Sequence, residues 1–104
     1  MSKQKIQDTT IQETILDQLM QTKVHGFPFF AYTGIKDYVM ASDDTLILHL
    51  PENPKGLDNI NVVYDFGMDV YKLYAFKGGV PLESKMEVYF DELGELITKY
   101  MGVY

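Results

Sequence analysis

Acidic side chains near the C-terminus are the clearest candidates for chemistry in this sequence. They recur every four residues at Glu83, Glu87, Asp91 and Glu95, and Glu92 lies next to Asp91. If the stretch is a helix, four carboxylates lie along one side, where like charges cost about 0.2–0.5 kcal/mol per pair. One helical turn spaces them at roughly 6 Å, near the spacing of phosphates along an extended nucleic-acid strand. The pattern therefore indicates either a solvated outer face or a surface that binds a basic protein.

The overall charge favours a basic protein partner over nucleic acid. The net charge is -6, and all nine basic residues are lysines. Arginine is the usual residue for bidentate contacts to phosphate and guanine, so its absence argues against direct nucleic-acid binding. Residues 83–104 hold five acids and two lysines, a net charge of -3 (2 minus 5) and half of the total.

No other group of residues matches a known catalytic or metal-binding spacing. The two histidines, His25 and His49, have no regularly spaced third ligand such as Asp65 or Asp69. The serines lack a nucleophile-elbow motif, and there is no cysteine. The aspartates Asp37, Asp43 and Asp44 lack the regular loop of a calcium site and read as turn residues. We therefore expect no enzymatic activity, no cofactor and no metal.

Tyrosines form a second group of interest. The chain has eight tyrosines and no tryptophan. Tyr64, Tyr71 and Tyr74 are expected on adjacent strands, and Tyr100 and Tyr104 close the chain. Tyrosine supplies contact area with a polar tip, which suits an interaction surface, although ordinary sheet packing explains the same pattern.

Length and composition set the background for these residues. The 104 residues are one domain by size, residues 1–104, with 46% hydrophobic residues for a core. Without cysteine the chain suits a reducing compartment. No apolar run approaches the roughly 18 residues of a membrane span, and the first ten residues lack the apolar centre of a signal peptide. These features predict a soluble cytoplasmic protein with no membrane contact.

Hydrophobic periodicity predicts the elements that would position the candidate residues. Residues 1–9 are expected to be disordered, and a helix over 10–22 begins with the capping-box pair Thr10 and Glu13. Alternating apolar residues then predict strands. These cover residues 29–33, 38–41, 45–50, 60–66 and 70–76.

The last predicted element is a helix from Leu82 to Met101, after a break at Gly78 and Gly79. Its apolar residues recur at helical spacing and lie mostly opposite the acids: they are Met86, Tyr89, Phe90, Leu93, Ile97 and Tyr100. Gly94 inside it suggests a close packing contact, and Gly102 is a suitable C-cap. Together the elements predict an α+β fold, with an antiparallel sheet of four to five strands flanked by an N-terminal and a C-terminal amphipathic helix.

Short segments in a fixed order resemble a known family. They are FFAYTGIKDYV (29–39), LILHLPENPKGLDNINVVY (46–64), MDVYKLYAF (68–76) and YMGVY (100–104). This order is similar to that of small proteins encoded by phages, prophages and conjugative elements, a family without an established activity. The resemblance implies a mobile-element origin and supplies no catalytic residue or cofactor. The acids of the last predicted helix are not part of the family pattern.

These observations favour a non-enzymatic mobile-element protein that acts by protein–protein binding. In its sharper form, the hypothesis is a counter-defence inhibitor, anti-CRISPR or anti-restriction, whose acids engage a basic surface of a host nucleic-acid-handling complex. One alternative is a small-molecule-binding protein or enzyme with a pocket between sheet and helices, near His49 or Asp65. Another is a homo-oligomeric accessory protein of conjugation or replication that pairs through a strand edge or a tyrosine face.

Overall fold

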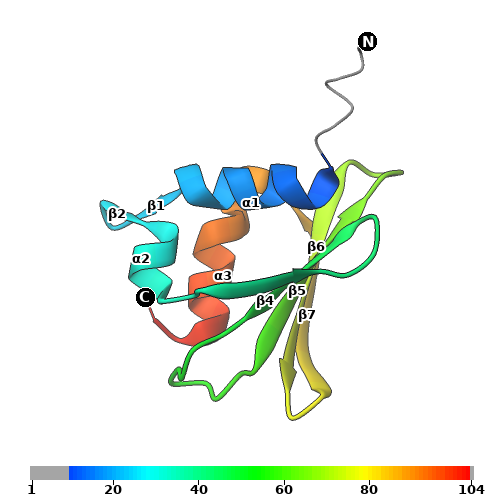
Figure 1. Ribbon diagram of the computed structural model, residues 1–104. Helices are drawn as coiled ribbons and strands as arrows, with labels where there is room; N and C mark the ends of the chain where they lie inside the picture. The colour runs from blue at the N-terminus through cyan, green and yellow to red at the C-terminus, as the bar shows by residue number, and fades with distance from the viewer. Residues whose placement is uncertain (1–9, 104) are drawn as a thin grey trace.

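A five-stranded antiparallel sheet, with helices packed on one face, makes up most of the structure (Figure 1). The computed structural model describes residues 10–103, with only the backbone of Glu83. The strands follow the order of the sequence across the sheet. They are β3 (Asp37–Met40), β4 (Thr45–His49), β5 (Asn59–Asp65), β6 (Val70–Lys77) and β7 (Val80–Val88).

Three helices, a 3-10 turn and a small hairpin are the other regular elements within residues 10–103. They are α1 (Ile11–Gln21), β1 (Lys23–Val24), β2 (Phe27–Pro28), α2 (Phe29–Thr33), the 3-10 turn η2 (Phe90–Glu92) and α3 (Leu93–Met101). The predicted α+β class is thus confirmed, and the main sheet has five strands with a helix at each end of the described chain. The expected disorder of residues 1–9 lies outside the described residues.

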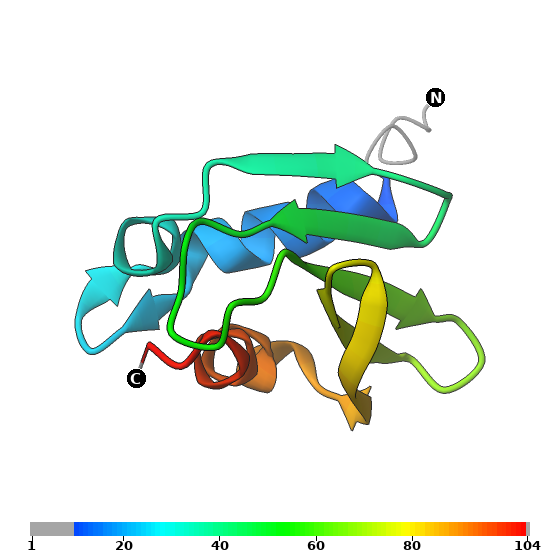
Figure 2. The ribbon, with the colours of Figure 1, turned by 90° about the horizontal axis from the view of Figure 1, so that it is seen from below.

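Alternation along the strands decides which face of the sheet is buried. Leu46 and Leu48 of β4 pair with Val62 and Ile60 of β5, and all four side chains are fully buried. Leu73 of β6 continues the same face. The helices add Ile15, Leu19, Leu93, Ile97 and Met101 to this core. The opposite face of the sheet carries no helix among the described residues (Figure 2).

The N-terminal helix begins where the sequence predicts. The Thr10 side chain accepts a hydrogen bond from the Glu13 N–H at 3.1 Å, and Glu13 accepts one from the Thr10 N–H at 3.0 Å. This reciprocal capping box satisfies two backbone donors that the helix itself cannot. Further along, Gln18 of α1 accepts a hydrogen bond from the Tyr71 hydroxyl at 3.2 Å, which ties the helix to β6.

The predicted first strand, residues 29–33, is wrong: this segment is the short helix α2. Pro28 precedes the helix, and Gly34 ends it in the left-handed region with φ 76°. The Thr33 hydroxyl donates to the Phe29 carbonyl at 3.0 Å within the turn. One helical turn lets Phe29 reach the core fully buried, while Phe30 packs against it from the side. The high β-propensity of aromatic residues therefore predicts the wrong backbone conformation here, because burial of Phe29 in the core favours a helical turn.

The predicted last helix is wrong in its first half, where residues 80–88 form strand β7. Gly78 and Gly79 both have positive φ, 58° and 80°, and Lys77 pairs with Val80 around them. A two-residue loop with two positive φ angles is the hairpin turn that matches strand twist. The chain therefore returns along β6. The expected apolar stripe fails here, since Met86, Tyr89 and Phe90 are exposed.

The second half of the predicted helix is confirmed as α3. It ends at Gly102, which has φ 82° and whose N–H donates to the carbonyls of Thr98 and Lys99 at 3.0 and 3.1 Å. Gly94 marks the close contact that the sequence suggested. A Cβ at Gly94 would lie 2.7 Å from Thr22 Cγ2 and 3.4 Å from Phe29 Cδ1. The absence of a side chain lets α3 approach the segment after α1.

Within residues 10–103, none of the helices has the length and apolar character needed to cross a membrane.

This packing predicts the effect of substitution at Gly94. Gly94→Ala should lower the free energy of unfolding by about 1–3 kcal/mol, because the new methyl group overpacks against Thr22.

Thr22→Ser removes the clashing methyl group and keeps the hydroxyl that donates to the Gln18 carbonyl at 2.7 Å. In that background Gly94→Ala should be neutral or stabilising, since alanine favours a helix by up to about 1 kcal/mol. Urea unfolding of the four variants measures the coupling. Stabilisation by Gly94→Ala in the wild-type background would contradict the contact.

Candidate protein-binding surface

The five acids predicted to form one helical surface lie on three different elements. Glu83 and Glu87 are in β7, Asp91 and Glu92 are in η2, and Glu95 is in α3. The premise that Glu83, Glu87, Asp91 and Glu95 share one helix face is therefore wrong. The physical reason is the Gly78–Gly79 turn, which commits the chain to pairing with β6 before any helix begins.

Two of the acids have local structural roles. The Glu92 side chain accepts a hydrogen bond from the Tyr89 N–H at 3.1 Å and caps the turn before α3. Glu87 lies in a bulge, because Tyr71 pairs with Val88 while Leu73 pairs with Lys85. Its φ of 57° is in the left-handed region, which costs a side-chain-bearing residue about 1–2 kcal/mol.

Asp91 and Glu95 lie at a hollow beside the first hairpin. The hollow has a volume of about 460 Å³. Its other lining residues are Thr22, Lys23, Val24, His25, Thr98 and Lys99. Two lysines share it with the two carboxylates, so the charges are mixed, unlike the acidic surface predicted from the sequence.

The bulge gives a prediction that separates a strand from a helix at Glu87. In a left-handed bulge, Glu87→Gly should be more stable than Glu87→Ala by about 1 kcal/mol, because glycine adopts positive φ without strain. In a helix the order would be reversed by a similar amount. Both variants lose the same carboxylate, so the comparison cancels the charge effect. Chemical denaturation of the two variants measures the difference, and a more stable alanine variant would refute the bulge.

The histidines and aspartates considered as ligands are dispersed. His49 of β4 lies between Asp37 and Asn59 on neighbouring strands and is exposed. His25 lies in the β1–β2 turn, with its ring 5.5 Å from that of Tyr32. Within residues 10–103, no three side chains of His, Asp or Glu come together in a way that could hold a metal ion.

Asp65 and Asp69 organise the β5–β6 turn. Asp65 accepts hydrogen bonds from the N–H groups of Met68 at 3.1 Å and Gly67 at 2.9 Å, and lies 3.4 Å from the Lys72 ammonium. The Met68 N–H is the main cause that holds the pKa of Asp65 below its ordinary value. Asp69 accepts from the Tyr64 hydroxyl, which raises the pKa of Tyr64. Both aspartates therefore stabilise a turn.

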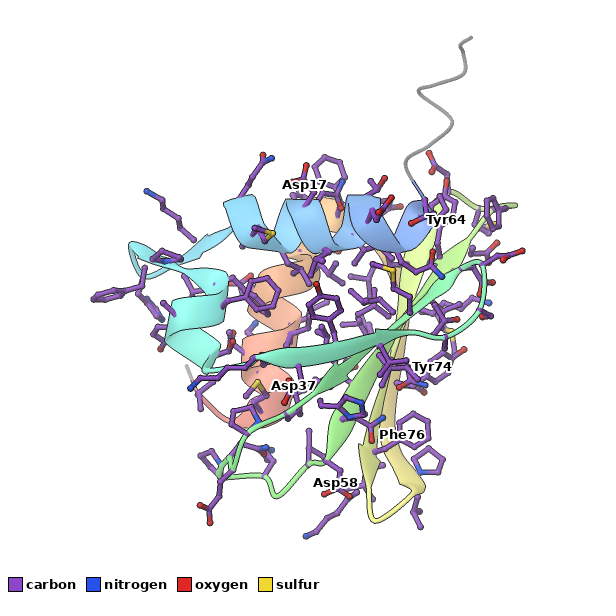
Figure 3. The ribbon with its side chains drawn as sticks, viewed as in Figure 1. Asp17, Asp37, Asp58, Tyr64, Tyr74 and Phe76 are labelled. Carbon is purple, nitrogen blue, oxygen red and sulfur yellow. The ribbon has the colours of Figure 1, made fainter. Side chains whose placement is uncertain are left out.

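The tyrosines of the hairpin are divided between the two faces of the sheet. Tyr64 and Tyr71 lie on the helix side, with ring centroids 5.5 Å apart. Tyr74 lies on the open face with Phe76 (Figure 3). The expected single tyrosine surface from these three strand residues is therefore not formed.

Among residues 10–103, no strand pairs with the outer side of the edge strand β3, a feature that the sequence did not indicate. The Ala41 N–H donates to the Thr45 carbonyl of the neighbouring strand at 3.0 Å. Backbone groups of successive residues in an antiparallel pair point alternately toward and away from the partner strand. The N–H and C=O groups of Tyr38 and Met40 therefore point away from β4. The side chains of Tyr38, Val39 and Met40 are 44%, 46% and 41% exposed.

An apolar groove accompanies this edge. It separates β3 from α1 and α2 and has a volume of about 240 Å³. Its lining residues are Leu16, Met20, Phe30, Ile35, Lys36 and Tyr38. Met20 on the rim is 62% exposed. Figures 1 and 2 both show β3 running alongside α1, with β3 at the outer edge of the sheet. We call β3 and this groove the β3 edge surface.

The opposite edge of the sheet is protected. Strand β7 pairs with β6 through two register shifts, one of them at Glu87, and contains Pro81 and Lys85. Bulges, proline and lysine are the devices by which edge strands avoid pairing with another chain. Strand β3 pairs with β4 in an unbroken register and has no proline. Of the two edges of the five-stranded sheet, β3 is the one suited to accept another strand.

Comparisons with protein-family models, curated proteins and solved structures find no match to this chain.

Proposed function

We propose that this protein is a non-enzymatic binding protein that acts through protein–protein contact at the β3 edge surface. The observation that carries the proposal is the combination of free backbone groups on Tyr38 and Met40 with an apolar groove beside them. A partner segment in extended conformation would add a sixth strand to the sheet. Main-chain hydrogen bonds would then supply affinity, and alternate side chains would enter the groove.

Each part of the surface has a distinct role in this proposal. Tyr38 and Met40 offer two N–H donors and two C=O acceptors to the added strand. On the helix side, Met20 and Leu16 offer apolar contact to every second side chain of the partner. Lys36 at one end of the groove favours a partner segment that carries an acidic residue there.

A display library of random linear peptides tests the proposal. Peptides enriched on the immobilised protein should have apolar residues at alternate positions. Met40→Pro should reduce their binding at least tenfold, about 1.4 kcal/mol, because it removes an outward N–H and blocks the approaching strand. The Met40 N–H is not used inside the sheet, so proline at this edge position leaves the β3–β4 pairing intact.

Two variants act as controls in the library experiment. Met40→Ala retains the N–H and should retain most of the binding, which separates backbone pairing from side-chain contact. Val39→Pro removes an N–H directed at β4 and should destabilise the fold itself. Enriched peptides that bind Met40→Pro as tightly as the wild type would refute the proposed surface, as would failure of a monomeric wild type to enrich any peptide.

We also propose, as a second function, the counter-defence role inferred from the acids and the mobile-element resemblance, in the cytoplasm of the host. The observation that favours it is that Asp91 and Glu95, from different elements, are both exposed at the rim of one hollow. A basic surface of a nucleic-acid-handling complex would contact these carboxylates, with Glu87 on the neighbouring strand. The nearby Lys23 and Lys99 weaken this attraction, so the β3 edge surface remains the first proposal.

Charge reversal tests the second function. The triple variant Glu87→Lys, Asp91→Lys, Glu95→Lys should lose inhibition of a restriction or CRISPR nuclease in a DNA-cleavage assay, since like charges would then face each other. Lys85→Glu, which adds an acid to β7, serves as a matched control and should retain inhibition. Circular dichroism checks that each variant is folded. Absence of inhibition by the wild type, or equal inhibition by the triple variant, would refute this role.

A further inference from the structure

We infer that a second copy of this chain occupies the β3 edge, so that two copies pair through antiparallel β3 strands about a twofold axis at Val39. The inference deepens the proposed function, because it names the occupant of the same β3 edge surface. A twofold axis perpendicular to the sheet maps each face onto itself. Paired residues must therefore lie on the same face, which limits the axis to positions centred on a residue.

Four positions within β3 satisfy this condition: Asp37, Tyr38, Val39 and Met40. An axis at Asp37 would place that carboxylate directly opposite the Asp37 carboxylate of the other copy, and like charges directly opposite are destabilising. An axis at Met40 would likewise place Asp37 directly opposite Asp43 of the other copy. An axis at Tyr38 would place Lys36 directly opposite Met40 of the other copy, which pairs a charged ammonium with an apolar side chain. Only the axis at Val39 avoids these conflicts.

The Val39 register is complementary on both faces of the sheet. On the helix side, Tyr38 of each copy lies opposite Met40 of the other, and these are the residues whose backbone groups point outward. Each such pair exchanges two N–H···O=C bonds, which gives four across the axis. On the open side the two Val39 side chains meet. All three side chains are exposed in the single copy and become covered in the pair.

Charge complementarity supports the same register. Lys36 lies opposite Ser42 of the other copy, beside Asp43 in the exposed β3–β4 turn. Within one copy, Lys36 and Asp43 are at opposite ends of β3, separated by roughly 20 Å at the rise of a strand. Lys36 and Asp43 can therefore attract each other only between copies, and twofold symmetry gives two equivalent pairs of this kind.

Single-cysteine variants test the register, because the natural sequence has no cysteine. Val39→Cys places two thiols at a non-hydrogen-bonded pair with Cα atoms about 4.5 Å apart, within the range of a disulfide. Asp37→Cys, on the same face, places them about 13 Å apart along the strand, beyond that range. Under mild oxidation, Val39→Cys should form cross-linked dimer at least about tenfold faster than Asp37→Cys. Equal rates, or faster cross-linking of Tyr38→Cys, would overturn the register.

A charge swap tests the pairing without altering the strand. Asp43→Lys should weaken self-association in sedimentation equilibrium at least tenfold, and Lys36→Asp added to it should restore the wild-type value. Adding Met40→Pro to Val39→Cys should abolish cross-linking in a variant shown to be folded by circular dichroism. A wild type that remains monomeric at millimolar concentration would overturn the inference.

The peptide library separates this inference from the proposed function. A monomeric wild type that still binds displayed peptides at β3 refutes the second copy and leaves the edge surface in place. A monomeric wild type that binds no peptide refutes both.

Discussion

Burial of one face of the antiparallel sheet is the constraint on which the rest of the structure depends. Leu46, Leu48, Ile60, Val62 and Leu73 point to that face and are covered completely. Because side chains and backbone groups both alternate along a strand, this one choice of face fixes much else. It places Val39 on the open side, Tyr38 and Met40 beside α1, and their backbone groups at the free edge. The β3 edge surface thus follows from the same alternation that builds the core.

The sequence predicted the regular parts of the fold because their signals are local. The capping box at Thr10 and Glu13 and the alternating leucines of β4 determine their elements without long-range information. The wrong predictions concern α2 and β7, two segments whose backbone conformation depends on burial in the core or on pairing after a turn. Phe29 adopts a helical turn to reach the core, and the sequence LESKMEV contains good helix formers that nonetheless pair with β6. The two adjacent glycines at positions 78 and 79 are the signal for that hairpin, because both positions of a two-residue hairpin turn need positive φ.

The candidate site could be predicted less well than the fold, for a physical reason. Acids spaced four residues apart line one side of a helix, but here α3 begins only at Leu93, after most of these acids. On a strand, a spacing of four still places side chains on one face, but the bulge at Glu87 interrupts that pattern too. Conversely, nothing in Asp37–Met40 distinguishes an edge strand from a central one. Strand β3 is an edge strand because of the order of strands in the sheet. That order is not visible in the local sequence of the four residues.

The two edge strands of the sheet differ in the features that control pairing with another chain. This difference supports a binding role for β3. Strand β7 contains a bulge at Glu87 that costs conformational energy, and a proline at position 81 that withholds a donor. Both features hinder pairing at that edge. Strand β3 has a free N–H at Tyr38 and at Met40, an unbroken register and apolar side chains above it. Its shortness limits the number of hydrogen bonds to a partner, so specificity must come from the groove and the flanking charges. Lys36 and Asp43 stand at opposite ends of the strand, the arrangement that an antiparallel second copy brings together and that a parallel one would keep apart.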